Sequence, residues 1–462
     1  MRSTVASGLC ALVLVAGCAA DPGPADPPVA ATSTGATASG DPSPSGSPEG
    51  SEEVIKSANV THVANVPPQA PLDGPQAWGT DLAFQGDHAF VGNFDGFSVF
   101  DISDPAKPTA VSRVLCPGEQ NDISVSGNLL FLSLDAARVG PECDSAEQRG
   151  TGWEGIRIFD ITDKAHPTFV SAVRTECGSH THTVVPGKNP DTVYLYVSSP
   201  GPEQSATCPA PHNNISVVEV PVKDPSAAKV VSQPKLSGQS GQEEIASGCH
   251  DITVYPEKDL AAAACFGDGF LLDISDRVKP TVLQRVSDEE NFSIWHSATF
   301  NNSATKVVFG DELGGGGSAT CDADTPKTKG ANAVYDLTPD RTLKLRGYFK
   351  IPREQDPTEN CVAHNGSLMP VPGKDILVQA WYQGGVSIVD FTAEPKEIGF
   401  FERGPVEGLG GSWSAYYYNG YIYSSDITRG LDVLRVDDPL TDPAKKVTMR
   451  ELNAQTQMSY PD

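Results

Sequence analysis

The stretch that decides the fold is Cys-His-Asp-Ile-Thr-Val-Tyr-Pro at residues 249–256, a short polar start followed by a β-rich run. Versions of it recur along the chain, and we call them the opening stretches. Four of the seven copies carry a histidine at the start, at residues 179–186, 249–256, 294–300 and 363–370. Three copies keep the register without histidine, at residues 79–84, 120–125 and 412–417. A pattern repeated in this way indicates one supersecondary unit used many times.

A second motif follows each opening stretch, an apolar run closed by Asp and Ser or Thr. The clearest copies are Gly-Phe-Ser-Val-Phe-Asp-Ile-Ser-Asp at residues 96–104 and Gly-Ile-Arg-Ile-Phe-Asp-Ile-Thr-Asp at residues 155–163. Looser or shorter copies stand at residues 214–220, 271–276, 334–338, 386–392 and 430–436. A period of roughly 45–60 residues with about four strand-like runs is typical of a β-propeller. The sequence predicts one all-β domain, a seven-bladed β-propeller over residues 58–462, with residues 59–66 as the outer strand of the last blade.

The second motif resembles the LVIVD repeat of bacterial surface propellers, and the resemblance covers about residues 78–437. In each unit we expect the opening stretch to be the innermost strand and the second motif to be the third strand. Insertions at residues 136–154, 200–213 and 312–330 then follow the second strand and gather on one face of the ring. Long loops collected on one face are where such scaffolds usually place function.

The N-terminal residues indicate export. Arg2 precedes an apolar run at residues 8–16, and Val-Ala-Gly-Cys follows at residues 15–18, which predicts a signal peptide over residues 1–17. The end of this segment resembles a bacterial lipobox, which implies a lipoprotein with diacylglycerol and palmitate on Cys18. The lipid bilayer is then a partner, and the protein is anchored on the extracytoplasmic face of the cell membrane. A plain signal peptide cut elsewhere is the alternative. Residues 18–57, rich in Pro, Ser, Thr and Gly, are predicted to be a disordered tether.

Charge and motif content exclude several function classes. The net charge of −26 disfavours a nucleic-acid partner, because such partners reward basic grooves. The sequence contains no P-loop and no dinucleotide fingerprint, so we expect no nucleotide cofactor. We expect the exported body to be a monomer.

The cysteines predict disulfides. Of the ten, Cys10 and Cys18 belong to the signal region. Four of the others stand just before an innermost strand, and four stand at the end of a second strand or in the next insertion. An even number in an exported chain indicates disulfides. Pairing neighbours across the two sets gives Cys116–Cys143, Cys177–Cys208, Cys249–Cys265 and Cys321–Cys361. Metal ligation is the weaker alternative, since the chain has no C-x-x-C and no zinc-ribbon spacing.

The opening histidines carry the hypothesis about chemistry. They are His180, His250, His296 and His364, at the starts of the innermost strands of four consecutive blades. Propeller symmetry places such residues at one height around the channel mouth, where imidazoles suit copper or zinc. His182 follows His180 by two residues, so it is expected to point the same way and to be a spare ligand. Asp81 and Asp122 are expected to extend the polar ring, and Asp311 and Glu312 are interpreted as solvated loop charge.

Two alternatives to a metal site stay open, a structural role for the histidines and a site for an organic ligand. The small polar residue after each histidine suits a hydrogen-bonding network within the blade. Three units lack the histidine and keep the blade pattern, which favours ligation over structure. The layout is also similar to the selenium-binding protein family, which includes copper-dependent methanethiol oxidases. Because the chain lacks the C-x-x-C of that family, the resemblance implies only a metal at the four histidines.

Two functions are therefore compatible with the sequence. The preferred one is a membrane-anchored metal-binding propeller, with an oxidoreductase as its catalytic form. The alternative is a non-catalytic propeller, a scaffold that recognises a protein, small-molecule or cell-envelope ligand through its looped face. The fold does not separate them, because propellers host both. The sequence shows no obvious acid, base or nucleophile beside the histidine register, so an enzymatic activity stays open.

Overall fold

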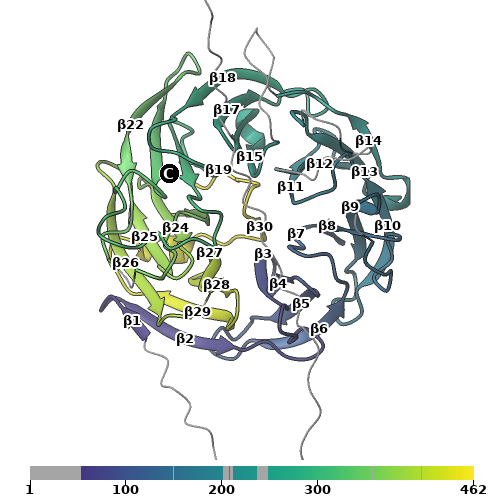
Figure 1. Cartoon of the computed structure of the whole chain (residues 1–462), viewed down its shortest axis with the longest axis horizontal. Helices are drawn as coiled ribbons and strands as arrows, with labels where there is room; N and C mark the ends of the chain where they lie inside the picture. Colours follow the sequence, from purple (N-terminus) through teal and green to yellow (C-terminus); the bar gives the residue numbers. More distant parts are fainter. Residues whose placement is uncertain are drawn as a thin grey trace, which may run out of the picture. The chain divides into compact units, whose positions relative to one another are not determined.

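The computed structural model describes residues 54–148, 150–200, 208, 212–236, 248–354, 357–406 and 408–461. They belong to one compact unit, Glu52–Asp462, whose strands are arranged in a ring (Figure 1). The predicted signal peptide, Cys18 and most of the predicted tether lie outside the described residues. Within the described ranges, no helix has the length and apolar character needed to cross a bilayer.

The described strands fall into seven antiparallel groups, which we call blades 1 to 7. Blade 1 comprises β3 (Gly79–Gln85), β4 (His88–Asn93), β5 (Gly96–Asp101) and β6 (Thr109–Leu115). Blade 2 comprises β7 (Ile123–Ser126), β8 (Leu129–Arg138), β9 (Trp153–Asp160) and β10 (Thr168–Arg174). Blade 3 comprises β11 (Thr181–Pro186), β12 (Thr192–Ser198), β13 (Ser216–Pro221) and β14 (Lys229–Ser232). Blade 4 comprises β15 (Ile252–Tyr255), β16 (Leu260–Cys265), β17 (Asp268–Asp273) and β18 (Thr281–Ser287).

The remaining blades follow the same order. Blade 5 comprises β19 (Trp295–Phe300), β20 (Lys306–Asp311), β21 (Asn332–Leu337) and β22 (Leu343–Phe349). Blade 6 comprises β23 (Asn365–Met369), β24 (Ile376–Ala380), β25 (Val386–Asp390) and β26 (Lys396–Arg403), with β1 (Val54–Lys56) outside β26. Blade 7 comprises β27 (Ser412–Tyr418), β28 (Tyr421–Asp426), β29 (Gly430–Val436) and β2 (Val60–Val66). A short parallel contact between β23 and β27 joins blades 6 and 7 into one nine-stranded sheet. Short 3₁₀ helices, at Pro225–Ala227, Pro256–Lys258 and Asp442–Lys446, lie between strands.

This arrangement confirms the predicted all-β propeller. Each opening stretch forms or leads into an innermost strand, and each second motif forms a third strand. The apolar side chains that make these runs hydrophobic form the core between neighbouring blades. Trp295 of blade 5, for example, contacts Phe309 and Tyr335 of its own blade and shares a buried cluster with Leu271 of blade 4. Burial of apolar surface, at about 25 cal/mol per Å², therefore stabilises each blade only when its neighbour is present.

The ring closes where residues from the two ends of the chain share a blade. As predicted, β2 forms the outer strand of blade 7 and pairs antiparallel with β29. The predicted tether extends too far, because Val54–Lys56 is the strand β1, paired with residues 401–403 of β26. Pairing with β1 covers the outer edge of blade 6, an edge that would otherwise expose unpaired backbone groups.

An ordered C-terminal tail, residues 447–461, crosses the centre of the ring (Figure 1). Its strand β30 (Glu451–Asn453) pairs antiparallel with β3, and the Asn453 side chain exchanges two hydrogen bonds with the Val125 backbone of blade 2. Further on, the backbone of the tail exchanges two hydrogen bonds of 2.8 Å with Val254 of blade 4. The tail thus contacts successive inner strands, and sequence reasoning assigned it no role of its own.

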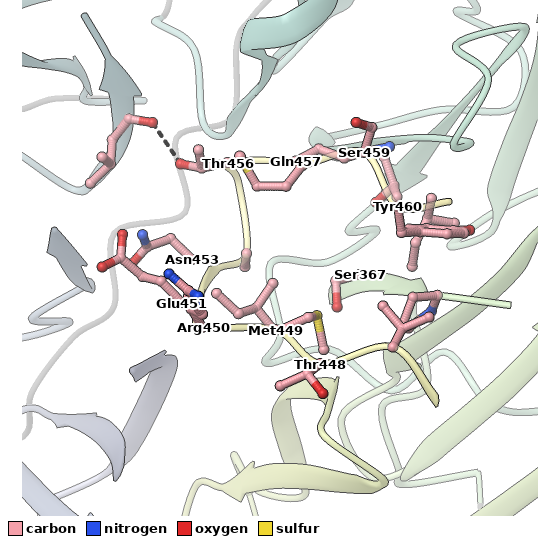
Figure 2. Close-up of a pocket in the computed structure, with 18 of the residues that line it drawn as sticks. Ser367, Thr448, Met449, Arg450, Glu451, Asn453, Thr456, Gln457, Ser459 and Tyr460 are labelled. Carbon is pink, nitrogen blue, oxygen red and sulfur yellow. Dashed lines mark hydrogen bonds between the residues drawn. The ribbon is translucent and has the colours of Figure 1, made fainter. Parts of the chain in front are cut away.

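The tail lies toward the ends of the inner strands that are farther from the opening histidines. Thr456 donates a hydrogen bond of 2.6 Å to the Val184 carbonyl, drawn dashed in Figure 2. A mostly apolar cavity of about 400 Å³ lies between the tail and strands β11, β19 and β23. Ser367 and Met449 are among the side chains around it (Figure 2). The tail therefore covers one mouth of the central channel.

All four predicted disulfides are present. They join Cys116 to Cys143, Cys177 to Cys208, Cys249 to Cys265 and Cys321 to Cys361. Each ties the approach to an innermost strand to the end of a second strand or to the loop after it. The bonds thus restrain the loops on the same face as the histidines, as the sequence predicted.

Candidate metal centre

Irregular strand starts bring the histidine side chains to the open mouth of the channel. In blade 5 the register shifts between Trp295 and Ser297, so His296 is the extra residue of a β-bulge. In blade 4, His250 and the residue after it both oppose a single residue of β16. Bulges of this kind change the direction of one side chain while the strand continues. Repetition of the irregularity in neighbouring blades points several imidazoles toward one place.

The four opening histidines lie side by side in chain order. The Nε2 atoms of His180 and His250 are 2.9 Å apart. The ring centroids of His250 and His296 are 3.8 Å apart, and those of His296 and His364 are 4.4 Å apart. The structure thus brings together all four residues that the sequence singled out.

Hydrogen bonds fix the orientation of the two outer imidazoles. His180 Nδ1 lies 2.7 Å from a carboxylate oxygen of Asp135, a residue of β8. His364 Nδ1 contacts the carbonyl oxygen of Trp413, so this nitrogen carries the proton and Nε2 keeps its lone pair. Carboxylates and carbonyls that hold the second imidazole nitrogen are the usual support of metal-binding histidines.

A buried carboxylate completes the cluster. The two oxygens of Glu312 lie 3.8 Å from His296 Nε2 and 3.8 Å from His364 Nε2, one to each ring. The Tyr382 hydroxyl donates a hydrogen bond of 2.5 Å to Glu312. His296 Nδ1 is buried without a hydrogen-bond partner. The ligand atoms of His296, Glu312 and His364 all lie within 4.8 Å of one another, close enough to share one ion.

Burial controls the protonation of these groups. It lowers the pKa of His250 and of His296 well below the usual range, and neighbouring imidazoles lower both further. Burial also lowers the pKa of His364 to about 3 and raises that of Glu312 to about 7. For His180, burial alone would lower the pKa, but the hydrogen bond and charge of Asp135 outweigh it and the pKa is raised. The rings of His250, His296 and His364 are therefore neutral at pH 7, with lone pairs available.

A cavity of about 250 Å³ opens onto the cluster. Phe94, Phe266 and Trp413 are among its apolar walls. The Gly-rich run after β20 forms another side. Gly316 has φ +74°, and a Cβ there would lie 2.7 Å from the Tyr382 hydroxyl, so glycine lets this loop approach the site closely. The space admits a small molecule beside the histidines.

His182 does not join the cluster, which corrects the prediction of a spare ligand. Its Nε2 lies 2.6 Å from the Ser124 hydroxyl and its Nδ1 lies 2.8 Å from the Ser133 hydroxyl. The i, i+2 argument failed because His180 precedes β11 and donates its backbone N–H to Ser198, the residue that pairs with Thr181. The strand alternation therefore does not extend back to His180.

The structure also corrects the interpretation of Asp311 and Glu312 as solvated loop charge. Asp311 is fully buried and accepts hydrogen bonds from the backbone N–H groups of Ser293, Ile294 and Gly330, so it organises loops. Glu312 lies inside the cluster. The signal that identifies Glu312 is its place at the end of a second strand, which ends on the same face as the histidines.

The small polar residues after the histidines serve the blade contacts. Thr181 donates a hydrogen bond of 2.8 Å to the carbonyl of His250 in the next blade, and Ser297 donates one of 3.4 Å to the carbonyl of His364. These hydrogen bonds run between blades, whereas the prediction placed the network within each blade. They use the histidine backbone and leave the imidazoles out.

Two further groups of potential ligands lie among the described residues. His250, Asp251 and His296 form one of them and belong to the same cluster, whereas the other, Cys177, Cys208 and His212, is not a metal site. Its two sulfur atoms are joined in a disulfide, and a metal requires thiolates.

Comparison with known proteins supports the repeat assignment. Residues 79–116 and 150–175 match the LVIVD repeat. The β-propeller domain of Myceliophteria thermophila Cps50 (Swd1) is similar, with TM-score 0.49 and 11% identity over 78% of this chain and 97% of that chain. A candidate 6-phosphogluconolactonase from Bacteroides uniformis has TM-score 0.47 and 12% identity over 76% of this chain and 89% of that chain. Among curated proteins, none matches this sequence. The sheet arrangement is that of a β-propeller, and two segments of it match the LVIVD repeat.

Proposed function

We propose that this propeller binds a transition-metal ion at its open channel mouth, through His180, His250, His296 and His364 with Glu312 as an additional ligand. One observation carries the proposal. Four imidazoles from four consecutive blades meet at one place, and a buried carboxylate lies between two of them. His296 Nδ1, which is buried without a hydrogen-bond partner, supports a role beyond blade structure.

The donor set fits copper or zinc. Metal–imidazole bonds of about 2.0 Å in a tetrahedral site place ligand nitrogens roughly 3.3 Å apart. The 2.9 Å between His180 Nε2 and His250 Nε2 is close to that value, so small side-chain rotations suffice. Asp135 holds the other nitrogen of His180, which keeps Nε2 directed toward the site.

The test is the metal content of the full chain, purified without a histidine tag, measured by inductively coupled plasma mass spectrometry. We expect about one copper or zinc ion per chain, with loss of the ion in His296→Ala. The matched control is His166→Ala, because His166 is an exposed histidine whose side chain is 82% accessible. Metal retained in His296→Ala, or lost equally in both variants, would contradict the proposal.

A second variant separates ligation from folding. Asp135→Asn keeps the size of the side chain and removes only the charge that holds His180. We expect metal affinity to fall by about 10–100-fold while the thermal unfolding midpoint changes little, as for other residues that support a ligand. Unchanged affinity in this variant would show that His180 is not a ligand.

The identity of the ion bears on catalysis. Zinc has no redox chemistry in proteins, whereas copper changes oxidation state. An oxidoreductase function therefore requires copper at this site, and its substrate must enter a cavity of about 250 Å³. If neither ion binds, the alternative of a scaffold that uses the looped face is favoured.

We also propose the membrane anchor, which the sequence around Cys18 alone supports. Radiolabelled palmitate should be incorporated into the wild-type chain and not into Cys18→Ser when both are expressed in a bacterium that processes lipoproteins. Equal labelling of both chains would contradict lipidation at Cys18.

A further inference from the structure

The C-terminal tail leaves one blade without hydrogen bonds at the far mouth of the channel. The hydrogen bonds described for residues 449–457 reach blades 1, 2, 3, 4, 5 and 7. Blade 6 is not among the partners of these residues, and its inner strand β23 lines the cavity of about 400 Å³ beside the tail. Ser367 of β23 lies at the wall of this cavity (Figure 2). The gap in the tail's contacts is thus the place where the cavity forms.

The Ser367 hydroxyl differs from the hydroxyls at the same position of other blades. Thr183, Thr253 and Ser367 each stand three residues after an opening histidine. Thr183 donates a hydrogen bond of 2.6 Å to the Ile252 carbonyl, and Thr253 donates one of 2.6 Å to the Ala298 carbonyl, each in the next blade. Ser367 is 6% exposed, and its Oγ is buried without a hydrogen-bond partner. Native proteins rarely keep such a group, so it indicates a ligand in the cavity that Ser367 lines.

Three polar side chains that the tail contributes to the wall already have partners elsewhere. Asn453 bonds the Val125 backbone, Thr456 donates to the Val184 carbonyl, and Gln457 accepts from the backbone N–H of Phe300. Most of the remaining wall is apolar. A water molecule needs two to four polar partners to be well ordered, so water in this cavity is weakly held. An apolar group that displaces weakly held water gains affinity.

The cavity has the size and the access of a small-molecule site. Small-molecule sites typically enclose about 300–1,000 Å³, and 400 Å³ falls in that range. Met458 lines the cavity and is 52% exposed, so the cavity reaches the surface there. Met449 lines it as well and is half-buried. Thioether side chains rotate freely and adapt to ligands of irregular shape.

Charges at the wall favour a neutral ligand. Arg450 lines the cavity but is exposed, so water hydrates its charge. The Glu451 carboxylate accepts hydrogen bonds from Gln85 and from the backbone N–H of Gly127. Neither residue therefore offers a buried ion pair, and a charged ligand would lose its hydration without compensation.

We propose that this cavity binds a neutral, mainly apolar small molecule with one hydrogen-bonding group, and that Ser367 Oγ bonds that group. The cavity lies toward the ends of the inner strands that are farther from the histidines. Its occupation therefore does not depend on a metal ion, and the two proposals stand independently.

The probe for the test is N-phenyl-1-naphthylamine, a neutral aromatic molecule with one N–H group whose fluorescence increases in apolar surroundings. It is titrated into the full chain carrying Cys18→Ser, so that no acyl chain takes up the probe. We expect saturable binding of about one probe per chain. The unfolding midpoint should rise with probe concentration, because a ligand that binds only the folded state stabilises it.

Variants at Ser367 locate the bound probe. Ser367→Ala removes only the hydroxyl and should weaken binding by about fivefold, the effect of one neutral hydrogen bond. Ser367→Phe also fills part of the cavity and should weaken binding further. The matched control is Ser425→Ala in blade 7, because the Ser425 hydroxyl is likewise buried without a partner and does not line this cavity. It should bind the probe as the parent chain does.

The unfolding midpoint without probe checks the role of the hydroxyl. Ser367→Ala should unfold at or above the parent midpoint, because it removes a buried group that lacks a partner. A lower midpoint would show that the hydroxyl serves the fold and would overturn the assignment. No saturable binding to the parent chain, or equal affinity in Ser367→Ala and Ser425→Ala, would also overturn it. If Ser367→Phe does not fold, the comparison of the two alanine variants decides.

Discussion

The C-terminal tail is expected to stabilise the ring mainly through one side chain, Asn453. Its Oδ1 accepts a hydrogen bond of 2.7 Å from the backbone N–H of Val125, and its Nδ2 donates one of 2.8 Å to the Val125 carbonyl. Asn453 is 5% exposed and Val125 is fully buried. Asn453→Ala therefore leaves two buried backbone groups without partners. At about 1–3 kcal/mol for each such group, the free energy of unfolding should fall by about 3 kcal/mol.

Asn302 provides a comparison with the same chemistry in a less buried place. Its side chain also exchanges two hydrogen bonds with a backbone, that of Tyr460 in the tail, at 2.9 and 3.0 Å. The Tyr460 end of this contact is only partly buried, so water replaces part of what Asn302→Ala removes. The expected loss is about 1 kcal/mol.

The assay is equilibrium unfolding in urea, followed by tryptophan fluorescence, on the wild type and both variants. We expect a lower midpoint at unchanged slope, with a larger change for Asn453→Ala than for Asn302→Ala. Equal changes, or a loss below about 0.5 kcal/mol for Asn453→Ala, would refute the claim that the tail is an integral part of the ring.

Three further results are expected. Replacement of Cys321 and Cys361 by serine opens a loop with a sequence separation of 40 and should cost about 4 kcal/mol in urea unfolding; a cost below 1 kcal/mol would contradict this. Gly430 has φ +85°, and a Cβ there would lie 2.2 Å from the Val66 carbonyl, so Gly430→Ala should lower the melting temperature and expose β2 to proteolysis; unchanged proteolysis would contradict this. Burial lowers the pKa of Lys350 to about 8, so the unfolded chain holds one more proton between about pH 8 and 10.5. Wild-type stability should rise across that window relative to Lys350→Met, and parallel pH profiles would contradict the assignment.

Repetition made the fold and the histidine register predictable. One copy of the opening stretch is a weak signal, but seven copies fix which residues begin the inner strands. Symmetry then places His250 beside His296 without any knowledge of the side-chain contacts. The disulfides followed for the same reason, because the strand order puts Cys249 and Cys265 at the same end of neighbouring strands.

Features outside the repeat were not predictable in this way. The tail matches no repeat copy, and its contact through Asn453 uses a side chain that ordinarily indicates a turn. Glu312 was hidden because an acidic residue beside a Gly-rich run is usually solvated. His182 was misplaced because strand alternation was extended to a residue before the strand. These failures share a physical cause: bulges and loop closure depend on tertiary contacts that local sequence does not encode.

The most direct test of the central claim is an anomalous diffraction measurement on crystals of the chain at the copper and zinc absorption edges. The account predicts one strong peak at the channel mouth, about 2.0 Å from the imidazole nitrogens of several of the four opening histidines, with Glu312 in contact. A map without a peak at this place, in crystals grown with either metal, would contradict the account and leave the four imidazoles as structural groups.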